Sequence, residues 1–149
     1  PATEHKRNMV AITRLLCTSI LVTTVALPVH GQELEKVRQE QLCAGMEMNR
    51  YLSNGTRVDC LTDDYAIEVD FSNKWAEAIG QSLMYAAELQ RLPGIILVCQ
   101  QGANSSLCIK HGYLIEQTVN WWRIGMTVWH CGAEDVRLDQ CRRVEYMQD

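Results

Sequence analysis

The alternation of hydrophobic and polar positions along the chain predicts helices and strands in turn. Residues 65–71 alternate with a period of two and are rich in β-branched and aromatic residues, which indicates a half-buried strand. Residues 95–99 are apolar throughout, as is typical of a strand buried on both faces. The predicted elements, in order, are a helix at 33–52, strands at 57–62 and 65–71, a helix from Ser72 or Asn73 to about Leu89, a strand at 95–99, a helix at 113–122 and a strand at 126–131.

The order of these elements, α-β-β-α-β-α-β, indicates an α/β domain with a mixed central sheet flanked by helices. Asn54-Gly55 is interpreted as the stop of the first helix, and Asp63-Asp64 as a tight turn between the two following strands. The segment from Glu134 onward is rich in charge and compatible with a further helix. A length of 149 residues and an apolar share of 47% suit one domain with its own core.

The first part of the chain has the pattern of a secretory signal. Lys6, Arg7 and Arg14 precede an apolar run at 15–27, and Gly31 follows at a position typical of signal-peptidase cleavage. We therefore expect a signal peptide at 1–31, a single domain at 32–149 and a secreted or periplasmic protein. The run is shorter than the roughly 20 residues of a membrane-spanning helix, so no stable membrane span is expected after cleavage. An uncleaved N-terminal anchor is the alternative.

Six cysteines lie beyond the predicted signal, and an even count in an exported chain favours disulfides. Six cysteines allow many pairings, and the sequence does not choose among them. Short loops favour Cys99–Cys108 and Cys131–Cys141, which leaves Cys43–Cys60. Structural zinc is the rival interpretation, but the chain has no C-x-x-C pair and its histidines do not cluster in the sequence.

The net charge of the predicted mature domain argues against a protein that binds nucleic acid through an overall positive charge. The formal net charge is −4 for the whole chain, and it becomes −6 once the three basic residues and Glu4 of the first 31 residues are removed. Such a domain repels a polyanion overall. The argument is weaker for an enzyme whose carboxylates are neutralised by a metal ion.

The strands on either side of Asp63-Asp64 bring two acidic residues together. If this pair is a two-residue turn, Asp59 lies directly opposite Glu68. Opposed residues have Cβ atoms about 4.5–5.5 Å apart, and like charges at that distance repel. A divalent cation such as Mg²⁺ offsets the repulsion, because it takes carboxylate oxygens as ligands. The alternatives are a pair open to solvent or one protonated carboxyl group, and a register shift of one residue removes the facing pair.

The same register assigns the remaining residues of the two strands. Arg57 lies opposite Asp70, and we expect this pair to be structural. The face opposite the acidic pair is predicted to be core, and it carries Val58, Cys60, Ile67 and Val69.

Three polar residues of the following helix lie on one face. Lys74, Gln81 and Tyr85 are separated by seven and four residues, which places them within about 20° of one another on a helix. Lys74 comes shortly after the strand that bears Glu68, so its ammonium group is in reach of the carboxylates. Simple solvation of Lys74 and Gln81 is the alternative.

Together these residues resemble the motifs of the PD-(D/E)xK nuclease superfamily. The match consists of Asp59, then Glu68-Val69-Asp70, then Gln81 to Tyr85, which is similar to the Q-x-x-x-Y motif of RecB-like exonucleases. Glu47, on the predicted first helix, matches the acidic residue that many members supply from that helix. The resemblance covers roughly residues 41–99.

The resemblance implies a restriction-endonuclease-like fold and hydrolysis of phosphodiester bonds in nucleic acid, with Mg²⁺ or Mn²⁺ as cofactor. It implies that Asp59 and Glu68 hold the metal, assisted by Glu47. Gln81 and Tyr85 would position the substrate backbone. A lysine would orient the attacking water and stabilise negative charge in the transition state.

One departure from the family pattern concerns that lysine. The family places it two residues after the glutamate, where this chain has Asp70. Lys74 is the candidate replacement from the helix. If Lys74 does not serve, the domain is a catalytically inactive exported binding or structural protein on a nuclease-like fold.

Overall fold

The structure, a computed structural model, describes residues 29–146. The predicted signal segment lies outside these residues, apart from its last three, which belong to the first helix. The elements are α1 (Val29–Leu42), β1 (Glu47–Tyr51), β2 (Arg57–Leu61), β3 (Tyr65–Phe71), η1 (Ser72–Lys74), α2 (Trp75–Leu89), β4 (Leu92–Cys99), α3 (Ser106–Trp121), β5 (Met126–Gly132), η2 (Leu138–Gln140) and β6 (Arg142–Tyr146). Among the helices of this part of the chain, none combines the length and the apolar character that crossing a bilayer requires.

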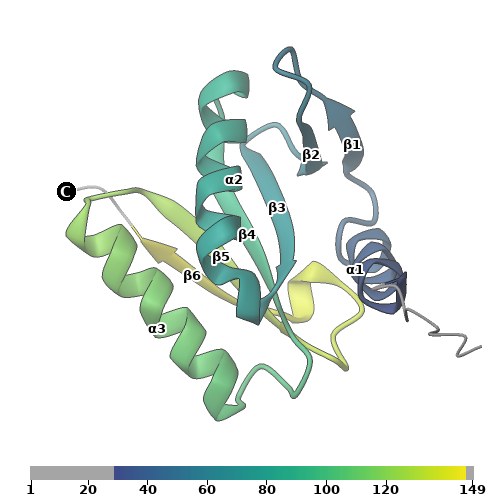
Figure 1. The fold of residues 1–149 in the computed structure, drawn as a ribbon, viewed down its shortest axis with the longest axis vertical. Helices are drawn as coiled ribbons and strands as arrows, with labels where there is room; N and C mark the ends of the chain where they lie inside the picture. The colour runs from purple at the N-terminus through teal and green to yellow at the C-terminus, as the bar shows by residue number, and fades with distance from the viewer. Residues whose placement is uncertain (1–28, 147–149) are drawn as a thin grey trace, which may run out of the picture.

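The six strands form one mixed sheet in which neighbours in the chain are neighbours in the sheet (Figure 1). β3, β4 and β5 run parallel, whereas β1, β2 and β6 join the sheet antiparallel. Parallel neighbours need a crossover connection, and α2 and α3 supply the two that are required. Because such crossovers are right-handed and the strands advance in one direction, both helices lie on the same face, where they contact each other. The predicted α/β domain with a mixed sheet is confirmed.

The sheet is buried on both faces, which explains the apolar runs in its centre. Alternate residues of β4 show this most clearly. Ile95 and Leu97 pack against α2 and α3, whereas Ile96 and Val98 pack on the opposite face, beside the end of α1. A strand covered on both faces has no polar positions to alternate with, so its sequence is continuously apolar.

Three disulfides tie the elements together. Cys43–Cys60 joins the end of α1 to β2, Cys99–Cys108 joins β4 to α3, and Cys131–Cys141 joins β5 to the residue before β6. The Cα atoms of the three pairs are 5.9, 5.6 and 4.6 Å apart. All three predicted pairings are confirmed. They are compatible with an oxidising, extracellular compartment.

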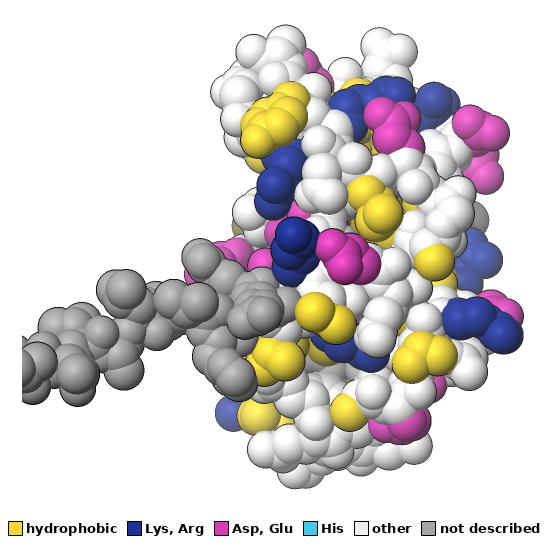
Figure 2. Space-filling view, turned by 90° about the vertical axis from the view of Figure 1, so that its right-hand side faces the viewer, with side chains coloured by type: hydrophobic (Ala, Val, Ile, Leu, Met, Phe, Trp, Pro, Cys, Tyr) yellow, Lys and Arg dark blue, Asp and Glu magenta, His cyan; other side chains and the backbone are white. Residues whose placement is uncertain are grey.

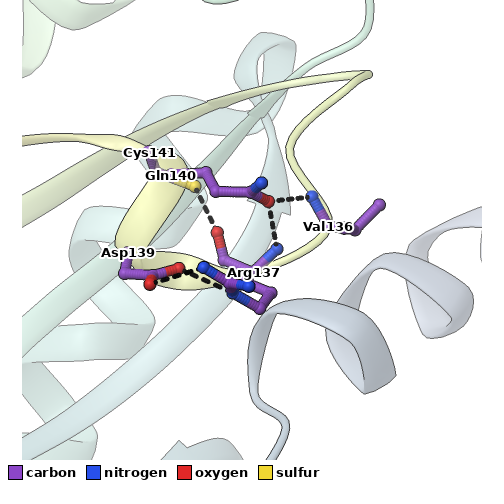
Figure 3. Close-up of polar contacts among 5 residues, drawn as sticks. All are labelled: Val136, Arg137, Asp139, Gln140 and Cys141. Carbon is purple, nitrogen blue, oxygen red and sulfur yellow. Dashed lines mark hydrogen bonds and ion pairs between the residues drawn. The ribbon is translucent and has the colours of Figure 1, made fainter.

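The turn that leads to Cys141 is held by its own polar side chains. Gln140 Oε1 accepts hydrogen bonds from the backbone N–H groups of Val136 and Arg137, both at 2.9 Å (Figure 3). The Arg137 guanidinium group donates to both carboxylate oxygens of Asp139. These contacts fix η2 and thereby place Cys141 against its partner on β5.

Two edge strands lie where helices were predicted. The predicted helix at 33–52 is wrong beyond Leu42, because residues 47–51 form β1. Asn54-Gly55 lies in the turn of the β1–β2 hairpin rather than at a helix end, and Gly55 adopts a φ of 83°, which favours glycine. The C-terminal segment forms η2 and β6 rather than a helix. Every side chain of β1 is exposed, so no hydrophobic alternation marks this strand in the sequence.

Candidate functional site

A cleft of about 350 Å³ lies between the β2–β3 hairpin, α2 and α1. Its lining consists of Glu35, Thr56, Arg57, Asp59, Glu68, Gln81, Met84 and Tyr85. A neighbouring hollow of about 550 Å³ shares Glu35, Arg57 and Asp59 with the cleft, so the two adjoin along these residues. A hydrogen bond from Ser53 to Glu88 ties the β1–β2 hairpin to the end of α2. Two of the elements that border the cleft are therefore connected by a hydrogen bond between their side chains.

The β2–β3 register is the one that the two-residue turn predicts. Cys60 pairs with Ile67 and Leu61 with Ala66, and the N–H of Thr62 donates to the Tyr65 carbonyl at 3.0 Å. This register puts Asp59 and Glu68 across from each other on the two strands, and both side chains line the same cleft. The predicted juxtaposition of the two carboxyl groups is confirmed.

The ladder between β2 and β3 ends where the acidic residues begin. The N–H of Val69 donates to Asp59 Oδ2 at 3.0 Å, so a side-chain carboxylate takes the place of a strand acceptor. Val58 accordingly packs with Tyr85 and Leu61 rather than with Cys60 and Ile67, which corrects its predicted place on the core face. Strand pairing between β2 and β3 stops at Cys60 and Ile67, and the cleft lies next to this point.

Glu68 is buried and incompletely paired. Its side chain is only 6% exposed, and its Oε2 atom has no hydrogen-bond partner among the described residues. Tyr85, which is 3% exposed, lies beside the carboxyl group, and its hydroxyl lowers the pKa of Glu68. A buried carboxylate oxygen without a partner is costly unless a proton or a cation compensates it.

The pKa values of both facing carboxyl groups are raised. Burial raises the pKa of Glu68 well above its usual range, and the charges of Asp59 and Asp70 raise it further. Burial also raises the pKa of Asp59, although the hydrogen bond from the Val69 N–H lowers it. In the absence of a cation the pair therefore retains a proton at neutral pH.

Lys74 is held at the edge of this site rather than inside it. Its ammonium nitrogen lies 3.1 Å from Asp70 Oδ1 and 2.8 Å from Glu35 Oε2. Of these two partners only Glu35 lines the cleft. Asp70, which is 2% exposed, thus pairs with Lys74, so the predicted structural pair with Arg57 is wrong. Burial raises the pKa of Asp70 to about 6, although the nearby ammonium group lowers it.

The acidic residue that the first helix contributes is Glu35 rather than Glu47. Glu47 begins the exposed strand β1, pairs with Arg50 and lines a different hollow, so its predicted position on the first helix is wrong. Glu35 lies on α1, lines the cleft and raises the pKa of both Asp59 and Glu68 by its charge. Glu33, Glu35 and Glu40 all lie on the predicted first helix, and no local pattern in the sequence singles out Glu35.

The two polar residues from the middle of α2 reach the cleft as the helical spacing predicts. Gln81 and Tyr85 both line it, one turn apart. Lys74, at the start of the same stripe, lies in η1 just before α2 and points to the Glu35–Asp70 pair. The structure therefore brings together Asp59, Glu68, Gln81 and Tyr85. Lys74 lies outside the cleft and is connected to it by its ion pair with Glu35.

The raised pKa of Glu68 predicts a pH dependence of stability. A carboxyl group whose pKa is higher in the folded than in the unfolded state contributes stability below its unfolded value of 4.5, and this contribution is lost as the pH rises. We expect the metal-free protein to lose free energy of unfolding between about pH 7 and about pH 9. Glu68→Gln should flatten this slope. His130 does not contribute to this slope, because its pKa lies below 7 in both states: 6.5 when unfolded and about 4 when folded.

Urea unfolding in the presence of a chelator, at both pH values and for both proteins, measures the effect. An equal slope in the wild type and in Glu68→Gln would show that the buried carboxyl group does not carry a proton at neutral pH.

Comparison with protein-family models, with curated proteins and with solved structures gave no match for this chain.

Proposed function

We propose that this protein is an exported, Mg²⁺-dependent, nuclease-like hydrolase that acts on phosphodiester bonds. The observation that supports it best is the unpaired, buried Oε2 atom of Glu68 beside Asp59 in the cleft. The Q-x-x-x-Y residues in the same cleft and the resemblance to PD-(D/E)xK nucleases connect this acidic pair to phosphodiester chemistry.

The residues present suit a hard divalent cation. Asp59 and Glu68 would hold it, with Glu35 close enough to assist directly or through water. All three offer carboxylate oxygens, the ligands that Mg²⁺ and Mn²⁺ prefer. When bound, such an ion polarises a phosphoryl oxygen and lowers the pKa of an attacking water.

The other residues of the cleft suit a phosphate-bearing substrate. Arg57 is the basic residue of the cleft lining, and Lys36 lines the adjoining hollow beside it. They provide positive charge next to the carboxylates in a domain that is acidic overall. On the side of the molecule drawn in Figure 2, basic and acidic side chains lie interspersed rather than gathered into one basic face. The proposed binding is therefore local to the cleft, with Gln81 positioning the substrate backbone.

A cleavage assay tests the proposal. Purified protein is incubated with end-labelled single-stranded DNA, double-stranded DNA and RNA, each with Mg²⁺, with Mn²⁺ and with a chelator. We expect cleavage of at least one substrate that depends on the metal. The absence of cleavage under all of these conditions would contradict hydrolysis and leave the second candidate.

The second candidate is a metal-binding protein of the same fold without catalytic activity. The ion pairs of Lys74 support it, because two carboxylates hold the ammonium group that hydrolysis would require at the attacking water. Asp70 occupies the position of the family's lysine, and no lysine lines the cleft within the described residues. Metal binding without cleavage would be the expected behaviour.

Lys74→Met separates the two candidates. If Lys74 stabilises the transition state, cleavage should fall by about 10²–10³-fold while the affinity for Mn²⁺ changes little. Lys110→Met, an exposed lysine on α3, is the matched control and should leave both unchanged. Full cleavage by Lys74→Met would show that this lysine has no part in the reaction.

A further inference from the structure

A second group of metal-ligating side chains lies apart from the carboxylate cleft. One donor atom each of Cys99, Cys108 and His130 lies within 4.8 Å of the other two. The three residues come from the end of β4, the first turn of α3 and β5. Each is 1% exposed. The cysteines form a disulfide in the structure, so the imidazole lies beside a buried S–S bond.

His130 has a free ring nitrogen in this buried position. Its Nδ1 atom has no hydrogen-bond partner among the described residues. Burial lowers the pKa of His130 to about 4, so the ring is neutral at physiological pH. A neutral imidazole is the form that ligates metals, and a buried nitrogen without a partner needs an explanation.

The packing around His130 leaves room for the ring and for little else. A Cβ atom on Gly112 would lie 2.5 Å from His130 Cε1. α3 approaches β5 this closely only because residue 112 has no side chain. Gly112 lies one helical turn after Cys108, so the same helix both supplies a sulfur ligand and makes room for the imidazole.

A small cavity adjoins the cluster at Cys99, although neither Cys108 nor His130 lines it. It measures about 60 Å³, and Cys99, Ser72 and Ser105 are among its lining residues. This volume holds a water molecule, and the serine hydroxyls offer it hydrogen bonds. Three protein ligands and one open position form a common arrangement of tetrahedral zinc.

We propose that the chain with the Cys99–Cys108 bond reduced binds one soft divalent cation, Zn²⁺, through these two sulfurs and His130. A dithiol reductant supplies two electrons and two protons to the S–S bond and closes to its own disulfide. On binding, the two thiols release their protons to solvent and ligate the cation as thiolates. Cys108 lies in the first turn of α3, where the helix N-terminus stabilises a thiolate. The cation replaces the covalent link between β4 and α3.

Cobalt substitution tests this site, because Co²⁺ bound to thiolates absorbs by charge transfer whereas Co²⁺ bound to carboxylates does not. The full chain is reduced with a dithiol, freed of it anaerobically and titrated with Co²⁺, which Zn²⁺ then displaces. We expect one thiolate-bound Co²⁺ per chain. Cys108→Ser and His130→Ala should each weaken this binding more than about 100-fold, beyond the cost of losing an outer-shell partner. His111→Ala removes a second buried histidine of the described residues, which contacts Ser72, and should leave the binding as it is.

Two results of the absorption measurement would overturn the proposal. One is a reduced, folded wild type without thiolate-to-cobalt absorption. The other is an absorption that persists in Cys108→Ser or His130→Ala, since the ligands would then be other cysteines. The melting temperature tests the site even if reduction destabilises the fold. Zn²⁺ should raise the melting temperature of the reduced wild type and should not raise that of reduced His130→Ala. A reduced chain that stays unfolded with Zn²⁺ also contradicts the site. Mg²⁺-dependent cleavage by the oxidised protein is independent of all these outcomes.

Discussion

Replacing Glu68 with glutamine, or Asp59 with asparagine, is expected to lower Mg²⁺-dependent cleavage by about 10³-fold, the scale of losing one preorganised electrostatic group in an active site. Both substitutions keep the shape of the side chain and remove the charge that a cation needs. Glu68→Gln should also fold well, because the native carboxyl group already carries a proton in the metal-free state. Initial rates of cleavage at saturating Mg²⁺ measure the effect.

Glu47→Gln is the matched control for this pair of variants. Glu47 is an exposed carboxylate that lines a different hollow, so cleavage should be unchanged. Glu35→Gln should reduce cleavage, because Glu35 takes the place that the sequence assigned to Glu47. Equal rates for the wild type and Glu68→Gln would contradict the assignment of the cleft as the active site.

Removing the Cys43–Cys60 disulfide is expected to lower the free energy of unfolding by about 3 kcal/mol, the chain-entropy value for a loop of this size. The bond joins α1 to β2 next to Asp59, so it also holds Glu35 over the cleft. Cys43→Ala/Cys60→Ala should therefore bind Mn²⁺ more weakly as well as unfold more easily. Urea unfolding without reductant gives the first quantity, and calorimetric titration gives the second.

Cys131→Ala/Cys141→Ala serves as the control for the link between this disulfide and the cleft. That bond closes a loop of 10 residues at the other end of the sheet, and its loss should destabilise the fold by a similar amount. Affinity for Mn²⁺ should stay as in the wild type. If both disulfide variants weaken Mn²⁺ binding equally, the effect reflects general stability rather than the position of α1.

The local features of the site were predictable because they depend on short-range rules. The turn at Asp63-Asp64 fixes the register of β2 and β3, and the register places Asp59 across from Glu68. The four-residue spacing on α2 likewise brings Gln81 and Tyr85 to one face. Both rules need only neighbouring residues, and the structure follows both.

The features that the sequence analysis missed depend on weak local signals or on long-range contacts. β1 has five exposed side chains and therefore no alternation, so its residues were assigned to the preceding helix, and Glu47 with them. α3 begins at Ser106 rather than at Tyr113, because Ser105 caps it and its first turn is held against β4 by the Cys99–Cys108 bond. The bridge from Lys74 to Glu35 spans 39 residues, and no local pattern marks it.

Calorimetric titration of the metal-free protein with Mn²⁺ tests the central claim most directly, since Asp59 and Glu68 are proposed to hold a divalent cation together. The wild type should bind at one site in the cleft and release a proton, which titration in buffers of different ionisation enthalpy detects. Glu68→Gln should abolish both the binding and the proton release, whereas Glu47→Gln should retain them. Undiminished Mn²⁺ binding by Glu68→Gln, or no binding by the wild type, would contradict the account.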